Sequence, residues 1–457
     1  MNKIFSKYIP IFFIFLSILF LLFIIYKAEY LHHGSKVYYY KIYYIIGIIS
    51  LFFSIINFFL NKELKIKTSI IIFSIIFSFY LIEGFLIISG LGVKNNEETY
   101  INIQDDPVIQ IKLKKNPNFD TRSRTEIYDD MKIKDRDIVL AIYPKLFLKD
   151  TNQQFFQLSG ISNKKTILCN EGGQYAIYQS DRYGFNNPDK EWDKKQVNFI
   201  LVGDSFVQGS CVNEKDTISG NIRKKIKVGA VLNLGYGGNG PLTEYATLRE
   251  YLPLTNTKKV IWVFIEANDI GNINAEINNF MLLNYLNNKE FSQNLHLIQN
   301  DIDIKLKKIL QKEILMEQQK IKANPLLKFI KLSFFRRYTT EKVSFTSVSS
   351  VDSGEGWKKL TEIISLSKNF TQQQGAKFYF VYIPDFKLKN YKKIIKIVKN
   401  LDIPIIDIYK ELHLTLEDPM ALYPFGLKDQ HYNELGYRLI AETILNKIDE
   451  YDRLEKE

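Results

Sequence analysis

The chain has 457 residues, and 61 Lys and Arg against 50 Asp and Glu give it a net charge of +11. The first 92 residues hold eight Lys, no Arg and three acids, so they account for +5 of this charge. The basic excess is therefore spread along the chain, without the clustered stripe that nucleic-acid binding needs, and we expect no nucleic-acid partner. Two cysteines are too few for a multi-cysteine zinc or iron–sulfur framework.

Three long apolar runs stand at the beginning of the chain, at about Tyr8–Tyr26, Ile42–Leu60 and Ser69–Ile88. Each is close to the ~20 residues that a helix needs to cross a hydrocarbon core. The sequence therefore predicts a three-helix transmembrane anchor over residues 1–92, with the lipid bilayer as a partner. The first run could instead be a signal peptide, but it is long and no small-residue cleavage site follows it.

The lysines between the runs predict the orientation. The cytoplasmic loops of membrane proteins carry the excess of Lys and Arg. Five lysines fall on the side of the amino terminus and three on the other side. With an odd number of spans, we expect a multi-pass membrane protein with a cytoplasmic amino terminus and a large extracytoplasmic domain, periplasmic or on the outer face. Glu83 lies near the outer end of the third run, where it can reach the interface.

Cys169 and Cys211 are the only cysteines. Disulfides persist outside the cytoplasm, so the expected location predicts that these two residues are bridged. Their separation in the sequence gives a loop-closure contribution of about 4 kcal/mol in the chain-entropy model. The alternative is a pair of buried free thiols.

Residues 93–195 mix short β-prone runs with turn residues, at Ile109–Leu113, Asp137–Ile142 and Phe155–Leu158. No catalytic motif stands out there. The sequence predicts an accessory extracytoplasmic region that is mostly β or irregular.

The pattern changes from residue 196 onward. Short apolar runs typical of buried parallel strands alternate with helix-length segments, which predicts an α/β domain whose parallel sheet is covered on both faces. The predicted strands are Asn198–Val202, Ala230–Leu234, Val260–Ile265, Lys377–Ile383 and Ile403–Ile408, and the helices are Asp216–Ile226, Leu242–Tyr251, Gly356–Gln373, Tyr391–Lys399 and a last one after Asn433.

Residues 276–355 interrupt this alternation, so the α/β domain is predicted in two parts, 196–275 and 356–457. The interruption contains the amphipathic stretch Asp301–Lys322 and the Ser/Thr/Val-rich segment Thr339–Ser353. It is a helical insertion that serves as a lid or a partner surface, or a solvated excursion without chemistry, because long insertions cost a fold little.

Residues able to do chemistry follow the predicted strands. Ser205 comes after the first strand, Gly238 after the second and Asn268 after the third, while Asp429 and His431 directly precede the last helix. Open α/β sheets bind ligands at the carboxyl ends of their strands, so these loops should converge on one crevice.

The order and spacing of these blocks resemble the SGNH (GDSL-like) hydrolase family over about residues 196–275 and 356–450. The matching segments are "VGDSF", "NLGYGGNG" and "EAND", together with "SDRYGFNNP" at 180–188. The resemblance implies a three-layer, flavodoxin-like domain with Ser205 as nucleophile. It also implies Ser205, Gly238 and Asn268 as oxyanion donors. The Asp-x-His spacing of Asp429 and His431 is similar to that of polysaccharide O-acetyltransferase branches.

The chemistry of the side chains agrees with these roles. His431 is the residue type that can take the proton of Ser205 near neutral pH, and Asp429 would hold its other ring nitrogen. Glu266 departs from the family pattern, because a carboxylate beside an oxyanion hole opposes the developing negative charge unless it is paired or points away. We expect no metal and no cofactor, since the other histidines have no partners at metal-ligand spacing.

The sequence therefore predicts a membrane-anchored serine esterase or O-acyltransferase that forms an acyl-Ser205 intermediate and acts on an acylated extracytoplasmic glycan. A second hypothesis is a non-enzymatic scaffold of the same fold, altered at Glu266, that binds a glycan or an assembly partner. A third hypothesis is that the three spans form a channel-like or lipid-handling unit, which only the ionisable Glu83 favours.

Overall fold

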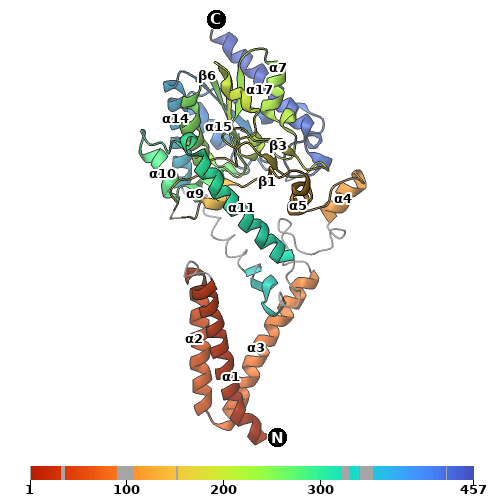
Figure 1. The fold of residues 1–457 in the computed structure, drawn as a ribbon, viewed down its shortest axis with the longest axis vertical. Helices are drawn as coiled ribbons and strands as arrows, with labels where there is room; N and C mark the ends of the chain where they lie inside the picture. The colour runs from red at the N-terminus through yellow and green to blue at the C-terminus, as the bar shows by residue number, and fades with distance from the viewer. Residues whose placement is uncertain are drawn as a thin grey trace. The chain divides into compact units, whose positions relative to one another are not determined.

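The computed structural model describes residues 2–31, 37–89, 107–150, 153–321, 329–336, 338–339, 354–428 and 430–457. The chain divides into two compact units (Figure 1). One comprises Met1–Glu97 and Ala323–Val343, and the other comprises Glu98–Lys322 and Ser344–Glu457.

The first unit is built on three helices: α1 (Asn2–Ile25), which continues into the π-helical turn η1 (Tyr26–Leu31), α2 (Val37–Phe59) and α3 (Lys62–Ser89). Among the described residues, three spans are long and apolar enough to cross a membrane, Pro10–Tyr30, Tyr40–Phe59 and Lys62–Ser89. The predicted membrane anchor is thus present as three apolar helices.

Glu83 of α3 is fully buried within this unit. Its carboxylate accepts hydrogen bonds from the backbone N–H groups of Phe334 (3.0 Å) and Phe335 (2.7 Å). The hydroxyl of Tyr80 donates to the carbonyl of Ile330 at 2.9 Å. The segment around residues 329–336, which belongs to the predicted insertion, therefore packs with the apolar helices, and Glu83 serves to anchor it.

The second unit contains a five-stranded parallel sheet in the order β5-β4-β6-β7-β8. Its strands are β4 (Val197–Val202), β5 (Ala230–Asn233), β6 (Thr257–Ile265), β7 (Lys377–Ile383) and β8 (Ile405–Asp407). In chain order this is the flavodoxin-like 2-1-3-4-5 arrangement, whose ligand site lies where the order reverses, between β4 and β6. The predicted α/β fold with a parallel sheet is confirmed.

Alternate side chains of each strand enter two apolar cores. In β4, Ile200 and Val202 face one core while Phe199 and Leu201 face the other. The first core is closed by α8 (Pro241–Tyr251), α14 (Gly354–Gln373) and α15 (Tyr391–Asn400), and the second by α7 (Ile218–Lys225), α16 (Ile408–Glu411) and α17 (Glu434–Leu454). Helices thus cover both faces, which gives three layers (Figure 1).

Three further described helices come after β6 in the chain. They are α9 (Asp269–Glu276), α10 (Phe280–Asn287) and α11 (Gln299–Ile321). The helix α11 coincides with the predicted amphipathic stretch and buries Ile302, Leu306 and Leu310 in the first core. Of the predicted Ser/Thr/Val-rich segment, all but Thr339 lies outside the described residues.

The accessory region differs in part from its prediction. It contains α4 (Pro107–Lys115), α5 (Arg124–Lys134) and a small sheet of β1 (Ile138–Leu140), β2 (Lys165–Ile167) and β3 (Ile177–Gln179). The β-prone run at Ile109–Leu113 is helical, because a short apolar run does not distinguish a helix from a strand by periodicity alone. Phe155–Leu158 is irregular, which agrees with the prediction of a region that is mostly β or irregular.

The accessory region shares its core with the α/β domain. Ile138, Phe156 and Ile167 are buried in the same apolar cluster as Ile200 and Val202 of β4. The two regions therefore fold as one body, because neither could keep this cluster away from water alone.

Candidate active site

Ser205 is presented by a tight turn at the carboxyl end of β4. It is the first residue of the short helix α6 (Ser205–Gln208), whose N-cap Asp204 accepts a hydrogen bond from the backbone N–H of Phe206 at 2.8 Å. The helix ends after one turn at Gly209, whose φ of 81° is in the left-handed region that glycine adopts without strain. The nucleophile-type hydroxyl is thus held at the sheet edge and remains partly exposed.

His431 reaches the same edge from the other end of the domain. It lies just before α17, whose N-cap Asn433 accepts a hydrogen bond from the N–H of Gly436 at 2.9 Å. The imidazole Nε2 is 2.9 Å from Ser205 Oγ. The ring of Phe206 packs against the imidazole, with 4.9 Å between the ring centroids. The structure therefore brings together the two residues that the sequence paired across 226 positions.

The carboxylate at the other side of the imidazole belongs to Glu171. Its Oε1 is 2.9 Å from His431 Nδ1, and its Oε2 accepts the backbone N–H of His431 at 2.7 Å. A carboxylate only accepts here, so Nδ1 carries the proton and Nε2 of the neutral ring is free to accept from Ser205. Asp429, which the sequence predicts for this position, lies outside the described residues.

The surroundings of His431 change its pKa. Burial by itself would lower the pKa, but the hydrogen bond to Glu171 and the charges of Glu171 and Asp204 outweigh it and raise the pKa above the ordinary 6.5. Glu171 and Asp204 stabilise the imidazolium that forms when His431 takes a proton, and this makes the imidazole a stronger base.

Sequence reasoning missed Glu171 because it comes from the accessory region, where no motif stands out. It occupies the tip of the hairpin between β2 and β3, 260 positions before His431. One signal was available: Glu171 is two residues after Cys169, and the disulfide predicted between Cys169 and Cys211 places that tip beside the segment that follows Ser205. The structure contains this disulfide, with 4.8 Å between the two Cα atoms.

Asn268 lies on the Ser205 side of the third strand. Its side-chain amide Nδ2 donates to Asp204 Oδ2 at 2.8 Å, which leaves the second N–H of the same amide available. Burial raises the pKa of Asp204, against the opposing hydrogen bonds from Asn268 and Phe206. Asp204 thus fixes both the turn that carries Ser205 and the amide of Asn268.

The glycine-rich loop after β5 is held from both ends. Near its start, the N–H of Gly237 donates to Gln208 Oε1 of α6 at 2.9 Å. At its end, Glu276 accepts from the N–H groups of Gly240 (2.7 Å) and Leu242 (2.9 Å). Gly238 has a φ of 76°, in the left-handed region that glycine adopts without strain, so the backbone conformation favours glycine at this position.

Glu266 is the departure from the family pattern, and the structure shows how its charge is compensated. Both carboxylate oxygens are engaged, one by the hydroxyl of Tyr382 and the other by the backbone N–H of Asn390. Tyr382 belongs to β7, on the opposite side of β6 from the β4 turn. The carboxylate is therefore paired and directed away from Ser205.

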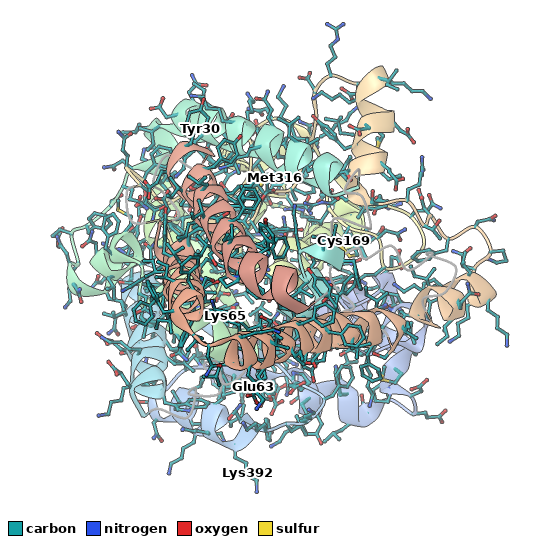
Figure 2. All side chains as sticks on the ribbon, turned by 90° about the horizontal axis from the view of Figure 1, so that it is seen from below. Tyr30, Glu63, Lys65, Cys169, Met316 and Lys392 are labelled. Atoms are coloured by element: carbon teal, nitrogen blue, oxygen red, sulfur yellow. A yellow bond between two sulfur atoms is a disulfide. The ribbon has the colours of Figure 1, made fainter. Side chains whose placement is uncertain are left out.

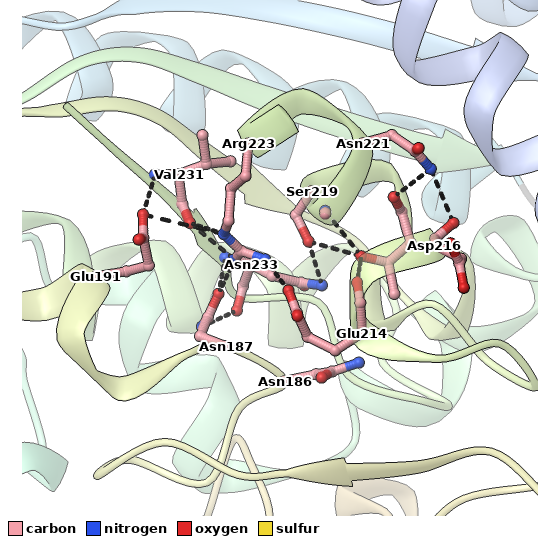
Figure 3. A network of polar contacts seen from close by, with 12 residues as sticks. Asn186, Asn187, Glu191, Glu214, Asp216, Ser219, Asn221, Arg223, Val231 and Asn233 are labelled. Atoms are coloured by element: carbon pink, nitrogen blue, oxygen red, sulfur yellow. Dashed lines mark hydrogen bonds and ion pairs between the residues drawn. The ribbon is translucent and has the colours of Figure 1, made fainter. Parts of the chain in front are cut away.

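The segment 180–188 is hydrogen-bonded to two of the loops that form the site. The Asn186 amide donates to the carbonyl of Gln208 at 2.8 Å, and the Asn187 amide donates to the carbonyl of Asn233 at 2.9 Å. Arg223 donates to the Asn187 amide oxygen and to the carbonyl of Val231 (Figure 3). This network ties α6 to the end of β5, so the motif acts by positioning the two loops.

Two further features bear on what the site can bind. Tyr236 and Tyr432, which flank the site in the sequence, are both fully buried and belong to the core. Ligand-type atoms of Glu171, Cys211 and His431 lie within 4.8 Å of one another. The Cys211 sulfur is in the disulfide and is therefore no thiolate ligand.

Comparison with known proteins gives structural likeness only. The chain is similar to a putative lipolytic protein of the G-D-S-L family from Desulfitobacterium hafniense (11% identity, 56% of this chain, 99% of the other, TM-score 0.29). It is also similar to the psychrotrophic esterase EstA from Pseudoalteromonas (11% identity, 57% of this chain, 100% of the other, TM-score 0.28). No protein-family model and no curated protein matches the sequence. The chain's own topology is that of a three-layer, flavodoxin-like α/β domain, with Ser205, Gly238 and Asn268 on the loops that follow β4, β5 and β6.

The contact between Glu171 and His431 predicts a change in pH dependence. A base must be neutral to accept a proton, so kcat/KM for ester hydrolysis should rise with pH through a midpoint above 6.5. In Glu171→Gln the midpoint should move to lower pH, and the plateau should fall by about 10²–10⁴-fold. Full pH–rate profiles of both proteins measure this. An unchanged midpoint would show that Glu171 does not act on His431 in the hydrogen-bonded relay of Ser205, His431 and Glu171.

Asn268 is hydrogen-bonded to Asp204 beside Ser205, whereas Glu266 is hydrogen-bonded away from Ser205, so substitutions at the two positions should affect the activity differently. Asn268→Ala should lower kcat by about 10²–10³-fold if its amide stabilises an oxyanion. Glu266→Gln, whose side chain can keep its acceptor for Asn390, is the matched control and should stay within about threefold of the wild type. Equal losses in the two variants would contradict this assignment.

Proposed function

We propose that this protein is a membrane-anchored serine esterase or O-acyltransferase that acts on ester-linked acyl groups of an extracytoplasmic glycan. The observation that carries the proposal is the hydrogen-bonded series Ser205 Oγ, His431 Nε2 and Nδ1, and Glu171, with successive distances of 2.9 Å and 2.9 Å. This arrangement of hydroxyl, imidazole and carboxylate is the one that makes a serine nucleophilic.

The chemistry follows from the geometry. As Ser205 Oγ attacks the ester carbonyl, His431 Nε2 takes its proton, and Glu171 stabilises the imidazolium. The backbone N–H groups of Ser205 and Gly238 and the Asn268 amide serve as donors to the tetrahedral oxyanion. The intermediate collapses to acyl-Ser205 while His431 returns the proton to the leaving alcohol. Water or a sugar hydroxyl, deprotonated by the same imidazole, then attacks the acyl carbon. The bond between this carbon and Ser205 Oγ breaks, and His431 returns the proton to Ser205 Oγ.

A glycan is proposed as the substrate because a membrane anchor keeps the enzyme beside surface polymers, and because the Asp-x-His spacing before α17 is similar to that of polysaccharide O-acetyltransferases. Hydrolysis and transfer share the acyl-enzyme and differ only in the acceptor. The scaffold alternative was based on Glu266, and its pairing with Tyr382 and Asn390 removes that reason. Glu83, the one argument for a channel-like unit, is engaged by Phe334 and Phe335.

Labelling of Ser205 tests the proposed function. The full-length protein in detergent should react with a fluorophosphonate and hydrolyse 4-nitrophenyl acetate. Ser205→Ala should lose the labelling and lower turnover by about 10³-fold or more, since it removes the nucleophile. Adding an oligosaccharide acceptor and measuring acyl transfer by mass spectrometry separates transferase from hydrolase. Labelling that persists in Ser205→Ala would exclude the acyl-Ser205 mechanism.

We also propose that the amino terminus is cytoplasmic and the α/β domain extracytoplasmic, in keeping with the lysine distribution and the disulfide. Two exposed positions test this. A membrane-impermeant maleimide added to intact cells should label Lys456→Cys and leave Lys62→Cys unlabelled, and both should react after lysis. The reverse labelling pattern would contradict the proposed topology and place the α/β domain in the cytoplasm.

A further inference from the structure

We propose that the Cys169–Cys211 disulfide positions Glu171 against His431, so that the relay of Ser205, His431 and Glu171 is assembled only in the oxidised protein. The disulfide would then control the reactivity of the site as well as the stability of the fold. Where this inference concerns catalysis, it depends on the proposed function; where it concerns the state of His431, it stands by itself.

The disulfide joins the two segments that carry the ends of the relay. Cys169 is two residues before Glu171, and Cys211 is six residues after Ser205. A two-residue separation leaves Glu171 little freedom to move away from a fixed Cys169. The covalent bond therefore limits the distance between the carboxylate and the segment of the nucleophile. Cys169 is labelled in Figure 2.

The disulfide also lies directly beside the imidazole. The Cys211 sulfur, a carboxylate oxygen of Glu171 and a ring nitrogen of His431 are all within 4.8 Å of one another. Cleavage of the S–S bond would place a free thiol at this point and release the hairpin tip. Both effects act on the same carboxylate–imidazole contact.

The other contacts of the hairpin tip lead elsewhere. The Asn170 amide donates to the carbonyl of Asp120 at 2.9 Å, and the N–H of Asp120 donates to the carbonyl of Gly173 at 2.8 Å. These bonds attach the tip to the segment after α4. The stem of the hairpin contacts α6 through the Gln208 amide and the Tyr178 hydroxyl, at 3.3 Å. The disulfide joins the tip covalently to the nucleophile segment.

The backbone of Cys211 gives an independent indication. Its φ is 63°, a left-handed conformation that residues with a side chain rarely adopt. Such a conformation persists where the surroundings enforce it, and it is concentrated at functional sites. At Cys211 the covalent bond to Cys169 is a constraint of this kind, which ties the local backbone to the position of the hairpin tip.

A double-mutant cycle in the full-length protein tests the inference. The double variant Cys169→Ala/Cys211→Ala should lower kcat for 4-nitrophenyl acetate by about tenfold or more with KM unchanged, because the substrate still binds but the base is weaker. In a Glu171→Gln background, removal of the disulfide should have no further effect. Multiplying losses, or no loss from the cysteine variant, would overturn the inference.

A readout that needs no turnover separates this inference from the proposed function. Diethyl pyrocarbonate modifies neutral imidazole, so the pH dependence of His431 carbethoxylation, followed on its peptide by mass spectrometry, reports its pKa. We expect a midpoint above 6.5 in the wild type and the same lower midpoint in Glu171→Gln and in the cysteine variant. If the midpoints shift but no ester is cleaved, the positioning holds and the proposed function fails. Identical midpoints in wild type and cysteine variant would refute the positioning.

Reduction of the wild-type protein guards against variants that fail to fold. Two electrons and two protons from dithiothreitol convert the disulfide into two thiols, and the reagent becomes a cyclic disulfide. Activity should fall on reduction and return on reoxidation, while the cysteine variant should be insensitive. Ser123→Ala is the control for stability alone, because it removes the N-cap of α5 and should lower Tm while leaving kcat and the His431 midpoint unchanged. Unchanged activity in the fully reduced wild type would exclude the switch.

Discussion

The site depends on the way one carboxylate holds one histidine. Glu171 binds both the ring Nδ1 and the backbone N–H of His431, so it fixes the tautomer of the imidazole and the place of the loop before α17 at the same time. A single hydrogen bond to the ring would leave the loop free to move, and a single bond to the backbone would leave the ring free to rotate. With both in place, Nε2 is directed at Ser205 Oγ.

The sheet supplies the other part of this geometry. Because the strand order reverses between β4 and β6, the chain segments that follow these strands lead to opposite faces of the sheet. Ser205 follows β4, Asn268 follows β6, and the two are joined through Asp204. The same division explains Glu266, which directly follows β6 and is hydrogen-bonded on the β7 side, by Tyr382 and by Asn390. The negative charge of Glu266, which would oppose an oxyanion beside Ser205, is thus held on the β7 side by Tyr382 and Asn390.

The sequence predicted the α/β domain well for a physical reason. Strands buried on both faces are short continuous apolar runs, and β7 coincides with its predicted bounds while β4 and β5 differ by one residue at one end. Ser205 was found because it follows such a strand, and His431 because it precedes the last helix. Glu171 was not, because the choice of acid rests on a contact between residues 260 positions apart. The sequence favours Asp429 through an Asp-x-His spacing that resembles polysaccharide O-acetyltransferase branches, and Asp429 itself lies outside the described residues.

The division of the chain into two units has a consequence for its release from a membrane. Since Ala323–Val343 group with the three apolar helices, the backbone passes between the units three times, near residues 97, 322 and 343. A protease that cut only the first of these connections would not free the α/β unit from the bilayer, because residues 323–343, which group with the apolar helices, would still be joined to it in sequence. Release of the α/β unit would require two more cuts, near residues 322 and 343, and the released fragment would then be two chains, 98–322 and 344–457, joined only by their shared core.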